Sequence, residues 1–230
     1  MAQAGYQVVW LDLEHSHQSD EEAIHLGRTI AHLGMVSLVR IPELSRTHVQ
    51  RLLDGGVEII TLPMVEGAAQ ATELVHLGKY PPLGRRGISS STPRTGYTLG
   101  PDPEKRLQEV NDATRLMVLV ESEKAYEELD AILGVEGIDM IGVGPNDWGA
   151  SLGLFGAEAE EYLAPRIDRI ISLSAEAGKT VAMGVSSPVQ ASHYYDLGAR
   201  LFLIGGTDIA MKRKALVDAI TPFADQEIQA

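Results

Sequence analysis

Two carboxylates stand just after short apolar segments in the second half of the chain. Glu121 follows Arg115–Val120, and Asp147 comes shortly after Asp139–Val143. If these segments are neighbouring parallel strands, both carboxylates reach the same edge of a sheet, and carboxylate oxygens are ligands that Mg²⁺ and similar cations prefer. Acidic residues also favour the first turn of a helix, so Glu121 could open a helix and Asp147 could cap one. The spacing leaves both interpretations open.

A histidine follows the first apolar segment, Val8–Asp12. In Asp12-Leu13-Glu14-His15 the imidazole stands beside carboxylates that could orient it for proton transfer near neutral pH. An acid/base role for His15 with Asp12 competes with the interpretation that His15 is a surface residue.

An arginine ends the next apolar segment, Val36–Arg40. At the edge of a sheet, a guanidinium can bind a substrate carboxylate through two parallel hydrogen bonds. A structural ion pair of Arg40 with Asp12 or Asp54 is the competing interpretation.

The composition narrows the chemistry further. The chain has no cysteine, which excludes thiolate nucleophiles and thiolate metal sites. An imine-forming enzyme needs a buried lysine at the catalytic edge, but every lysine stands in a loop, on a helix or just before a strand. Metal-assisted enolisation is the carbon–carbon chemistry that remains. The lysines are Lys79, Lys105, Lys124, Lys179, Lys212 and Lys214.

The segments that must position these residues alternate in type along the whole chain. Short apolar runs alternate with amphipathic stretches, and this alternation predicts a parallel α/β fold. Several amphipathic stretches begin with a residue that commonly caps helices, such as Ser19, Ser45 or Thr207. Polar residues follow several of the runs, which favours a TIM-type (β/α) barrel, because a doubly wound sheet gathers function at one switch point. The predicted strands are Val8–Asp12, Val36–Arg40, Glu58–Leu62, Arg115–Val120, Asp139–Val143, Thr180–Met183 and Leu201–Ile204.

The chain of 230 residues suits a single domain spanning 1–230, with a long loop at 79–103. Its formal charge of −13 would repel nucleic acid and anionic lipid, and neither a membrane span nor a basic leader is evident, so we expect a cytoplasmic protein.

A glycine-rich turn, Gly205-Gly206-Thr207, precedes the last predicted helix. It is either a weak phosphate-binding turn or a plain turn.

Taken together, several motifs resemble the HpcH/HpaI family of class II pyruvate-dependent aldolases over nearly the whole chain. They include Asp12-Leu13-Glu14-His15, Leu52-Leu53-Asp54-Gly55-Gly56, Tyr80-Pro81-Pro82-Leu83-Gly84-Arg85-Arg86-Gly87, Val120-Glu121-Ser122 and Gly144-Pro145-Asn146-Asp147. The resemblance implies that Glu121 and Asp147 bind a divalent metal ion, Mg²⁺, Mn²⁺ or Co²⁺. It also implies that Arg40 binds pyruvate and its enolate, that His15 with Asp12 moves protons, and that Gly144, Pro145 and Asn146 contact the substrate.

The implied reaction is reversible cleavage of a 4-hydroxy-2-oxo acid to pyruvate and an aldehyde, with the aldehyde expected nearer the loop Lys79–Pro103. A related enolate enzyme, either an oxaloacetate decarboxylase or a CoA-ester lyase, is one alternative. A non-catalytic metabolite-binding relative is another.

The chain departs from the family pattern at two places. Leu119 stands where the family usually has a glutamine, which removes a polar contact near pyruvate. Family members also begin with a strand and helix before the segment that matches Gly5–His15, so we expect seven strands rather than eight. The open edges would favour a homo-oligomer. The resemblance implies a trimer or hexamer, with a helix from about Asp208 to Phe223 reaching across to a partner.

Overall fold

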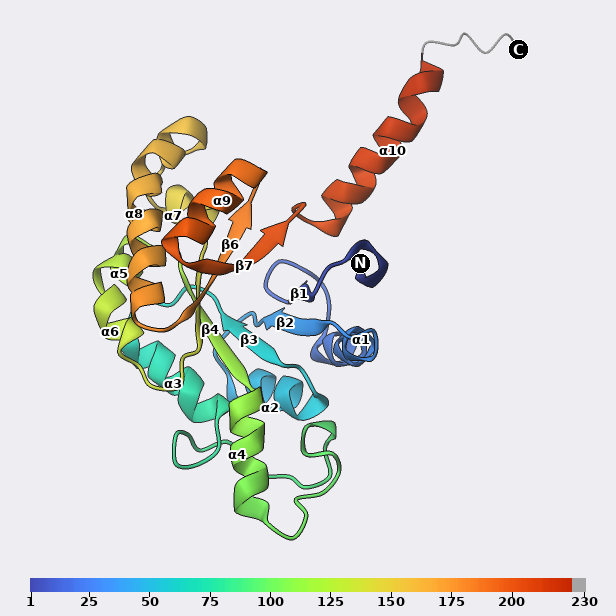
Figure 1. The fold of residues 1–230 in the computed structure, drawn as a ribbon, viewed down its shortest axis with the longest axis vertical. Helices are drawn as coiled ribbons and strands as arrows, with labels where there is room; N and C mark the ends of the chain where they lie inside the picture. Colours follow the sequence, from blue (N-terminus) through green and yellow to red (C-terminus); the bar gives the residue numbers. More distant parts are fainter. Residues whose placement is uncertain (225–230) are drawn as a thin grey trace.

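The computed structural model describes residues 1–224, and its core is one sheet of parallel strands (Figure 1). The strands are hydrogen-bonded in sequence order from the first to the seventh. They are β1 Val8–Asp12, β2 Val36–Arg40, β3 Ile59–Leu62, β4 Arg115–Val120, β5 Met140–Val143, β6 Thr180–Val185 and β7 Ala199–Ile204. A doubly wound sheet reverses its strand order at a switch point, and this sequential order does not.

Helices connect the strands and pack around the outside of the sheet, except for the last helix, which follows β7 (Figure 1). They are α1 Asp20–His32, α2 Arg46–Gly55, α3 Ala68–Gly78, α4 Pro103–Ala113, α5 Glu123–Glu127, α6 Leu129–Leu133, α7 Pro145–Ser151, α8 Gly156–Glu176, α9 Pro188–Leu197 and α10 Asp208–Ala224. Short 3₁₀ turns lie at Ala2–Ala4 and Pro93–Thr95.

The sheet curls around a small inner core. Residues that are far apart in strand order, such as Trp10 of β1, Met117 of β4 and Leu201 of β7, belong to one apolar cluster on the concave face. A larger cluster lies between the convex face and the helices. The fold is therefore a half-barrel with α/β topology, and the prediction of a (β/α) barrel with seven strands is confirmed.

The half-barrel is open between β1 and β7, which do not pair within residues 1–224. On β1, residues alternate between buried and half-buried, because Val9 and Leu11 pack under the helices while Val8, Trp10 and Asp12 face the concave side. The edge strands thus expose part of the barrel interior.

The sequence signals for helix starts are confirmed at three helices. Ser19 forms a capping box with Glu22 at α1, Ser45 accepts a hydrogen bond from the backbone of His48 at α2, and Thr207 accepts one from Ala210 at α10. Each side chain satisfies a backbone N–H that the helix itself leaves unbonded.

The loop 79–103 is anchored at the amino ends of the strands. Lys79 is buried and donates to the carbonyl oxygens of Asn111 and Thr114 and to Asp139, and the last two precede β4 and β5. Arg86 is also buried, stacks on Tyr80 and donates to Asp54.

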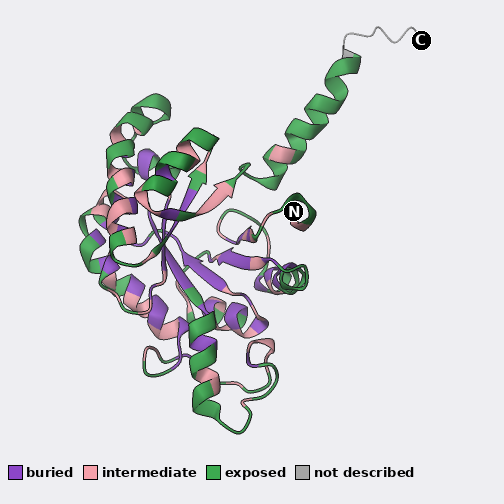
Figure 2. Ribbon diagram, in the orientation of Figure 1, coloured by how far each residue is buried: buried purple, intermediate pink, exposed green. Residues whose placement is uncertain are grey.

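Helix α10 projects away from the half-barrel, and its side chains are exposed along nearly its whole length (Figures 1 and 2). Its exposed apolar side chains include Ile209, Leu216, Val217, Ile220 and Phe223. In the part of the chain that the structure describes, no helix combines the length and apolar character needed to cross a membrane.

Candidate active site

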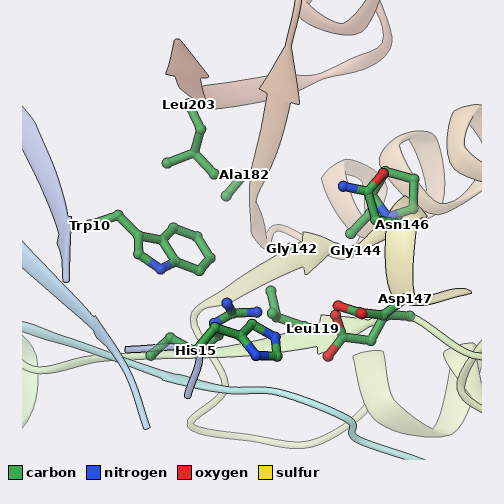
Figure 3. A pocket seen from close by; sticks show the side chains of 13 residues that line it. Trp10, His15, Leu119, Gly142, Gly144, Asn146, Asp147, Ala182 and Leu203 are labelled. Carbon is green, nitrogen blue, oxygen red and sulfur yellow. The ribbon is translucent and has the colours of Figure 1, made fainter. Parts of the chain in front are cut away.

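A cavity of about 320 Å³ lies on the concave side of the sheet, at the carboxyl ends of the strands (Figure 3). In (β/α) barrels this end carries the active site. The lining residues are Trp10, His15, Arg40, Leu119, Glu121, Gly142, Val143, Gly144, Pro145, Asn146, Asp147, Ala182 and Leu203.

Glu121 is the buried carboxylate of this cavity, and 1% of its surface is exposed. Its Oε1 accepts a 2.6 Å hydrogen bond from the backbone N–H of Met64, whose φ of 51° is unusual for a residue with a side chain. Its Oε2 is buried and has no hydrogen-bond partner among residues 1–224. Desolvation raises the pKa of Glu121, and the negative charges of Asp147 and Glu14 raise it further.

Gly144 lies so close to Glu121 that any side chain there would collide with it. A Cβ at position 144 would stand 2.1 Å from Oε2 of Glu121, far inside van der Waals contact. Because Gly144 has no side chain, Oε2 of Glu121 can occupy this space.

Asp147 lies in the first turn of α7 and is exposed. The N-cap of that helix is Gly144, so Asp147 is not the cap, and Glu121 stands before Ser122, the N-cap of α5. Glu121 therefore does not open a helix and Asp147 does not cap one, although Asp147 is an acidic residue in a first turn. Both carboxylates line the same cavity, in which Figure 3 labels Asp147.

Arg40 extends into the cavity from the end of β2, and its guanidinium contacts the carboxylates of Asp12 and Glu14. Its Nε and Nη2 donate to Asp12 at 2.8 and 2.6 Å, and its Nη1 lies 2.9 Å from Oε2 of Glu14. Burial opposes ionisation of Asp12, but the hydrogen bonds and charge of Arg40 outweigh it and lower the pKa of Asp12. Of the two ion pairs considered from sequence, Arg40 forms the one with Asp12, while Asp54 pairs with Arg86.

His15 lines the cavity with an exposed side chain. Its Nε2 lies 3.6 Å from Oε2 of Glu14, whereas both oxygens of Asp12 are taken by Arg40. The expected pairing of Asp12 with the imidazole thus does not form in this structure. The reason is that Arg40 pairs with Asp12 across adjacent strands in register.

The donor set fits a hard divalent cation. No group of three or more His, Cys, Asp or Glu side chains in residues 1–224 is arranged as a ready-made metal site. Magnesium-type ions, however, commonly use one or two protein carboxylates and complete their shell with water and substrate. A buried carboxylate oxygen without a partner, next to a second carboxylate, has the charge and the free lone pairs for such an ion.

Sequence reasoning did not single out Glu14, Met64, Trp10 or Leu203. Glu14 had a signal, because it lies between Asp12 and His15 in the same motif. The roles of Met64 and Leu203 depend on contacts between distant segments. The expectation that the loop 79–103 lies near the site is wrong, since the loop is held at the opposite end of the sheet and none of its residues lines the described cavity.

Comparison with known proteins gives a consistent family match. The family model described as HpcH/HpaI aldolase/citrate lyase matches residues 1–215. A 2-keto-3-deoxy-L-rhamnonate aldolase from Salmonella gallinarum is 32% identical over 222 residues, which cover 96% of this chain and 82% of the relative.

Solved structures extend the match to the fold. The crystal structure of an HpcH/HpaI aldolase from Desulfitobacterium hafniense has a TM-score of 0.90 and 30% identity, covering 100% of this chain and 88% of that one. The citrate synthase SbnG has a TM-score of 0.85 at 22% identity, covering 96% of this chain and 86% of its own, which shows a shared fold alone.

Proposed function

This chain belongs to the HpcH/HpaI aldolase/citrate lyase family, and is thus a carbon–carbon lyase of the aldolase type; from this premise we propose that it cleaves 4-hydroxy-2-oxo acids to pyruvate and an aldehyde with a divalent metal ion. The observation that carries the proposal is the buried Oε2 of Glu121, which lacks a partner in the described chain and shares a cavity with Asp147. These two carboxylates would hold the ion. When bound, Mg²⁺, Mn²⁺ or Co²⁺ supplies positive charge that polarises the keto group and stabilises an enolate.

Arg40 would bind the substrate carboxylate. Its contacts to Asp12 and Glu14 fix the guanidinium in place, and Arg40 lines the cavity with N–H groups left over for a substrate. A fixed cation at this position would also stabilise the charge that develops on the enolate.

His15 would move protons. In the cleavage direction the 4-hydroxyl loses its proton to a base, the C3–C4 bond breaks, and its electron pair forms the enolate of pyruvate while C4 becomes the aldehyde carbon. Protonation of the enolate at C3 then gives pyruvate. An exposed imidazole near Glu14 can exchange protons with solvent, which suits this role.

Decarboxylation of oxaloacetate or cleavage of a CoA ester would use a similar enolate. A CoA site normally needs a basic groove, and among the described residues that line the cavity Arg40 is the cation, with its charge already shared by two carboxylates. Cleavage of a small free acid is therefore the function that the cavity supports best.

The open edges of the half-barrel support assembly into a homo-oligomer. The edge strands β1 and β7 and the apolar side chains of α10 would be covered by another copy, because unpaired edges and exposed apolar faces favour association. Sedimentation of the purified chain would show a trimer or hexamer. A stable monomer at micromolar concentration would contradict this part of the proposal.

A metal-depletion experiment tests the proposed function. Pyruvate release from a 4-hydroxy-2-oxo acid should be abolished by EDTA and restored by Mg²⁺, Mn²⁺ or Co²⁺, with oxaloacetate as the comparison substrate. Activity that survives exhaustive chelation would overturn the assignment. Trapping of pyruvate on a lysine by borohydride would do the same. A rate that is higher with oxaloacetate than with every hydroxy acid would favour the decarboxylase alternative.

A further inference from the structure

A buried tryptophan directly follows Asp147 in α7. Trp148 is fully buried, and its indole Nε1 donates a 3.1 Å hydrogen bond to Oε2 of Glu123. A buried indole N–H needs an acceptor, because leaving it unpaired would cost free energy. Glu123 is the first residue of α5 and lies two positions after Glu121. The bond therefore joins the segment that follows Glu121 to the helix that carries Asp147.

The carboxylate of Glu123 is also contacted from a third helix. Its Oε1 lies 3.6 Å from Nε of Arg166 on α8, and the guanidinium carbon of Arg166 lies 3.7 Å from the ring centroid of Tyr162. Tyr126 of α5 packs against the Trp148 ring, with 5.5 Å between the ring centroids. Helices α5, α7 and α8 are thus joined around Glu123 on one side of the sheet (Figure 1).

These contacts matter for Asp147, because its own side chain is exposed and is not fixed by burial. The position of Asp147 follows that of α7, a helix of only seven residues in which Trp148 is the buried side chain. A helix this short is marginal by itself, so its contacts with the rest of the fold decide where it lies. Trp148 and its hydrogen bond to Glu123 are therefore the contacts that hold Asp147 beside the cavity.

Glu121 does not depend on this hydrogen bond. It is buried at the end of β4, and its Oε1 accepts a hydrogen bond from the backbone of Met64. One carboxylate is thus fixed by its own contacts, while the other is placed by a short helix. Because Mg²⁺ and similar ions need their ligands in a defined geometry, the placement of α7 decides whether Asp147 and Glu121 can share an ion.

We propose that Glu123 is a positioning residue that acts through Trp148, and that their hydrogen bond places α7 so that Asp147 and Glu121 bind one divalent metal ion. The proposal rests on the proposed function and adds to it two residues that do not line the described cavity. Residues that orient the ligands of a metal ion affect its affinity without touching it. A role in packing alone would change the stability of the fold and leave the metal affinity of the folded protein unchanged.

The test measures Mn²⁺ binding by electron paramagnetic resonance of the free ion, together with urea unfolding of the metal-free protein. Trp148→Phe keeps an aromatic ring but removes the N–H, and Glu123→Ala removes its acceptor. Each should weaken Mn²⁺ binding by at least about tenfold, the loss typical of residues that orient metal ligands. The double variant should bind little worse than either single one, because both substitutions break the same bond. Glu123→Gln, whose amide oxygen can still accept from the indole, should recover most of the affinity.

Glu127→Ala is the matched control, because Glu127 lies four positions further along α5 and is exposed. It should bind Mn²⁺ as the wild type does. Wild-type Mn²⁺ affinity in folded Trp148→Phe and Glu123→Ala, with a loss of stability alone, would overturn the proposal. An affinity in Glu123→Gln as low as in Glu123→Ala would also overturn it.

Glu121→Gln separates this proposal from the proposed function. If Mn²⁺ binding is unchanged in Glu121→Gln, the metal site is wrong, and the positioning role fails with it. If Glu121→Gln loses Mn²⁺ binding while Trp148→Phe and Glu123→Ala keep it, the metal site stands and the positioning role alone is wrong.

Discussion

Each end of the sheet buries a charged side chain, but the two side chains differ in how fully their hydrogen bonds are satisfied. At the amino end, the ammonium of Lys79 donates to two carbonyl oxygens at 3.0 and 2.6 Å and to Asp139 at 3.3 Å. At the carboxyl end, Glu121 has one oxygen bonded and one buried oxygen with no partner in residues 1–224.

The pKa values of these two groups reflect the same contrast. Desolvation lowers the pKa of Lys79, and the charge and hydrogen bond of Asp139 oppose it. Desolvation raises the pKa of Glu121, and nearby carboxylates add to the shift rather than opposing it. A buried charge whose hydrogen bonds are satisfied is compatible with a purely structural role, whereas one that is left unsatisfied beside like charges is a candidate ligand site.

The largest effect is expected from Glu121→Gln, which removes the unsatisfied charge at the carboxyl end of the sheet. Glutamine keeps the acceptor for the N–H of Met64 but removes the charge, so activity should fall at least about a thousandfold, about 4 kcal/mol of transition-state stabilisation. Without metal, the free energy of unfolding should equal or exceed that of the wild type, because a desolvated charge is gone. Steady-state kinetics and urea unfolding measure both, with the exposed Glu127→Gln as control. A variant that keeps near-native activity would remove Glu121 from the metal site.

Substitution of Arg40 separates its binding role from its structural pairing. Arg40→Ala should lower kcat/KM by about 10² to 10³, the loss expected for one donor that stabilises an oxyanion. Arg40→Lys should recover little, because an ammonium cannot reproduce the paired contacts to Asp12. If a folded Arg40→Ala variant retained wild-type kcat/KM, its role would be confined to the ion pairs.

At the opposite end, Lys79→Met should act on stability instead of activity. Removing the ammonium takes one donor from each of two buried carbonyl oxygens and from Asp139, which keeps the N–H of Leu116; this should cost about 3 kcal/mol in the free energy of unfolding. The kcat/KM of the folded variant should stay close to the wild type, and exposed Lys105→Met should change neither. Loss of activity without loss of stability would reverse the assignment of the two ends.

The smallest effect concerns the acid dependence of stability. The pKa of Asp12 is lowered in the folded state, so its contribution is fully present above the unfolded-state pKa and is lost as the pH falls through the folded-state value. Wild type should therefore be more stable than Asp12→Asn near neutral pH, and the difference should shrink below about pH 4. Urea titrations over this range measure it. A difference that does not depend on pH would mean that Arg40 does not stabilise ionised Asp12.

Local sequence patterns were enough to predict the strands and the end of the sheet at which Arg40, Glu121 and Asp147 lie. The predicted apolar runs are strands with nearly the predicted bounds: β3 and β5 each begin one residue later than expected, β6 ends two residues later and β7 begins two residues earlier. Such runs are readable because burial of a parallel strand on both faces requires a nearly continuous apolar segment. A side chain that directly follows a strand must then lie at its carboxyl end.

Only the tertiary structure decided which of these groups touch. Arg40 could have paired with Asp12 or Asp54, and cross-strand register brought it to Asp12, leaving His15 nearest Glu14. Lys79 gave no sign in the sequence that it would be buried at the amino end of the sheet, and nothing local placed Leu203 across from Trp10. These contacts join segments far apart in the chain, and their partners are fixed by how helices and strands pack, which a linear pattern does not encode.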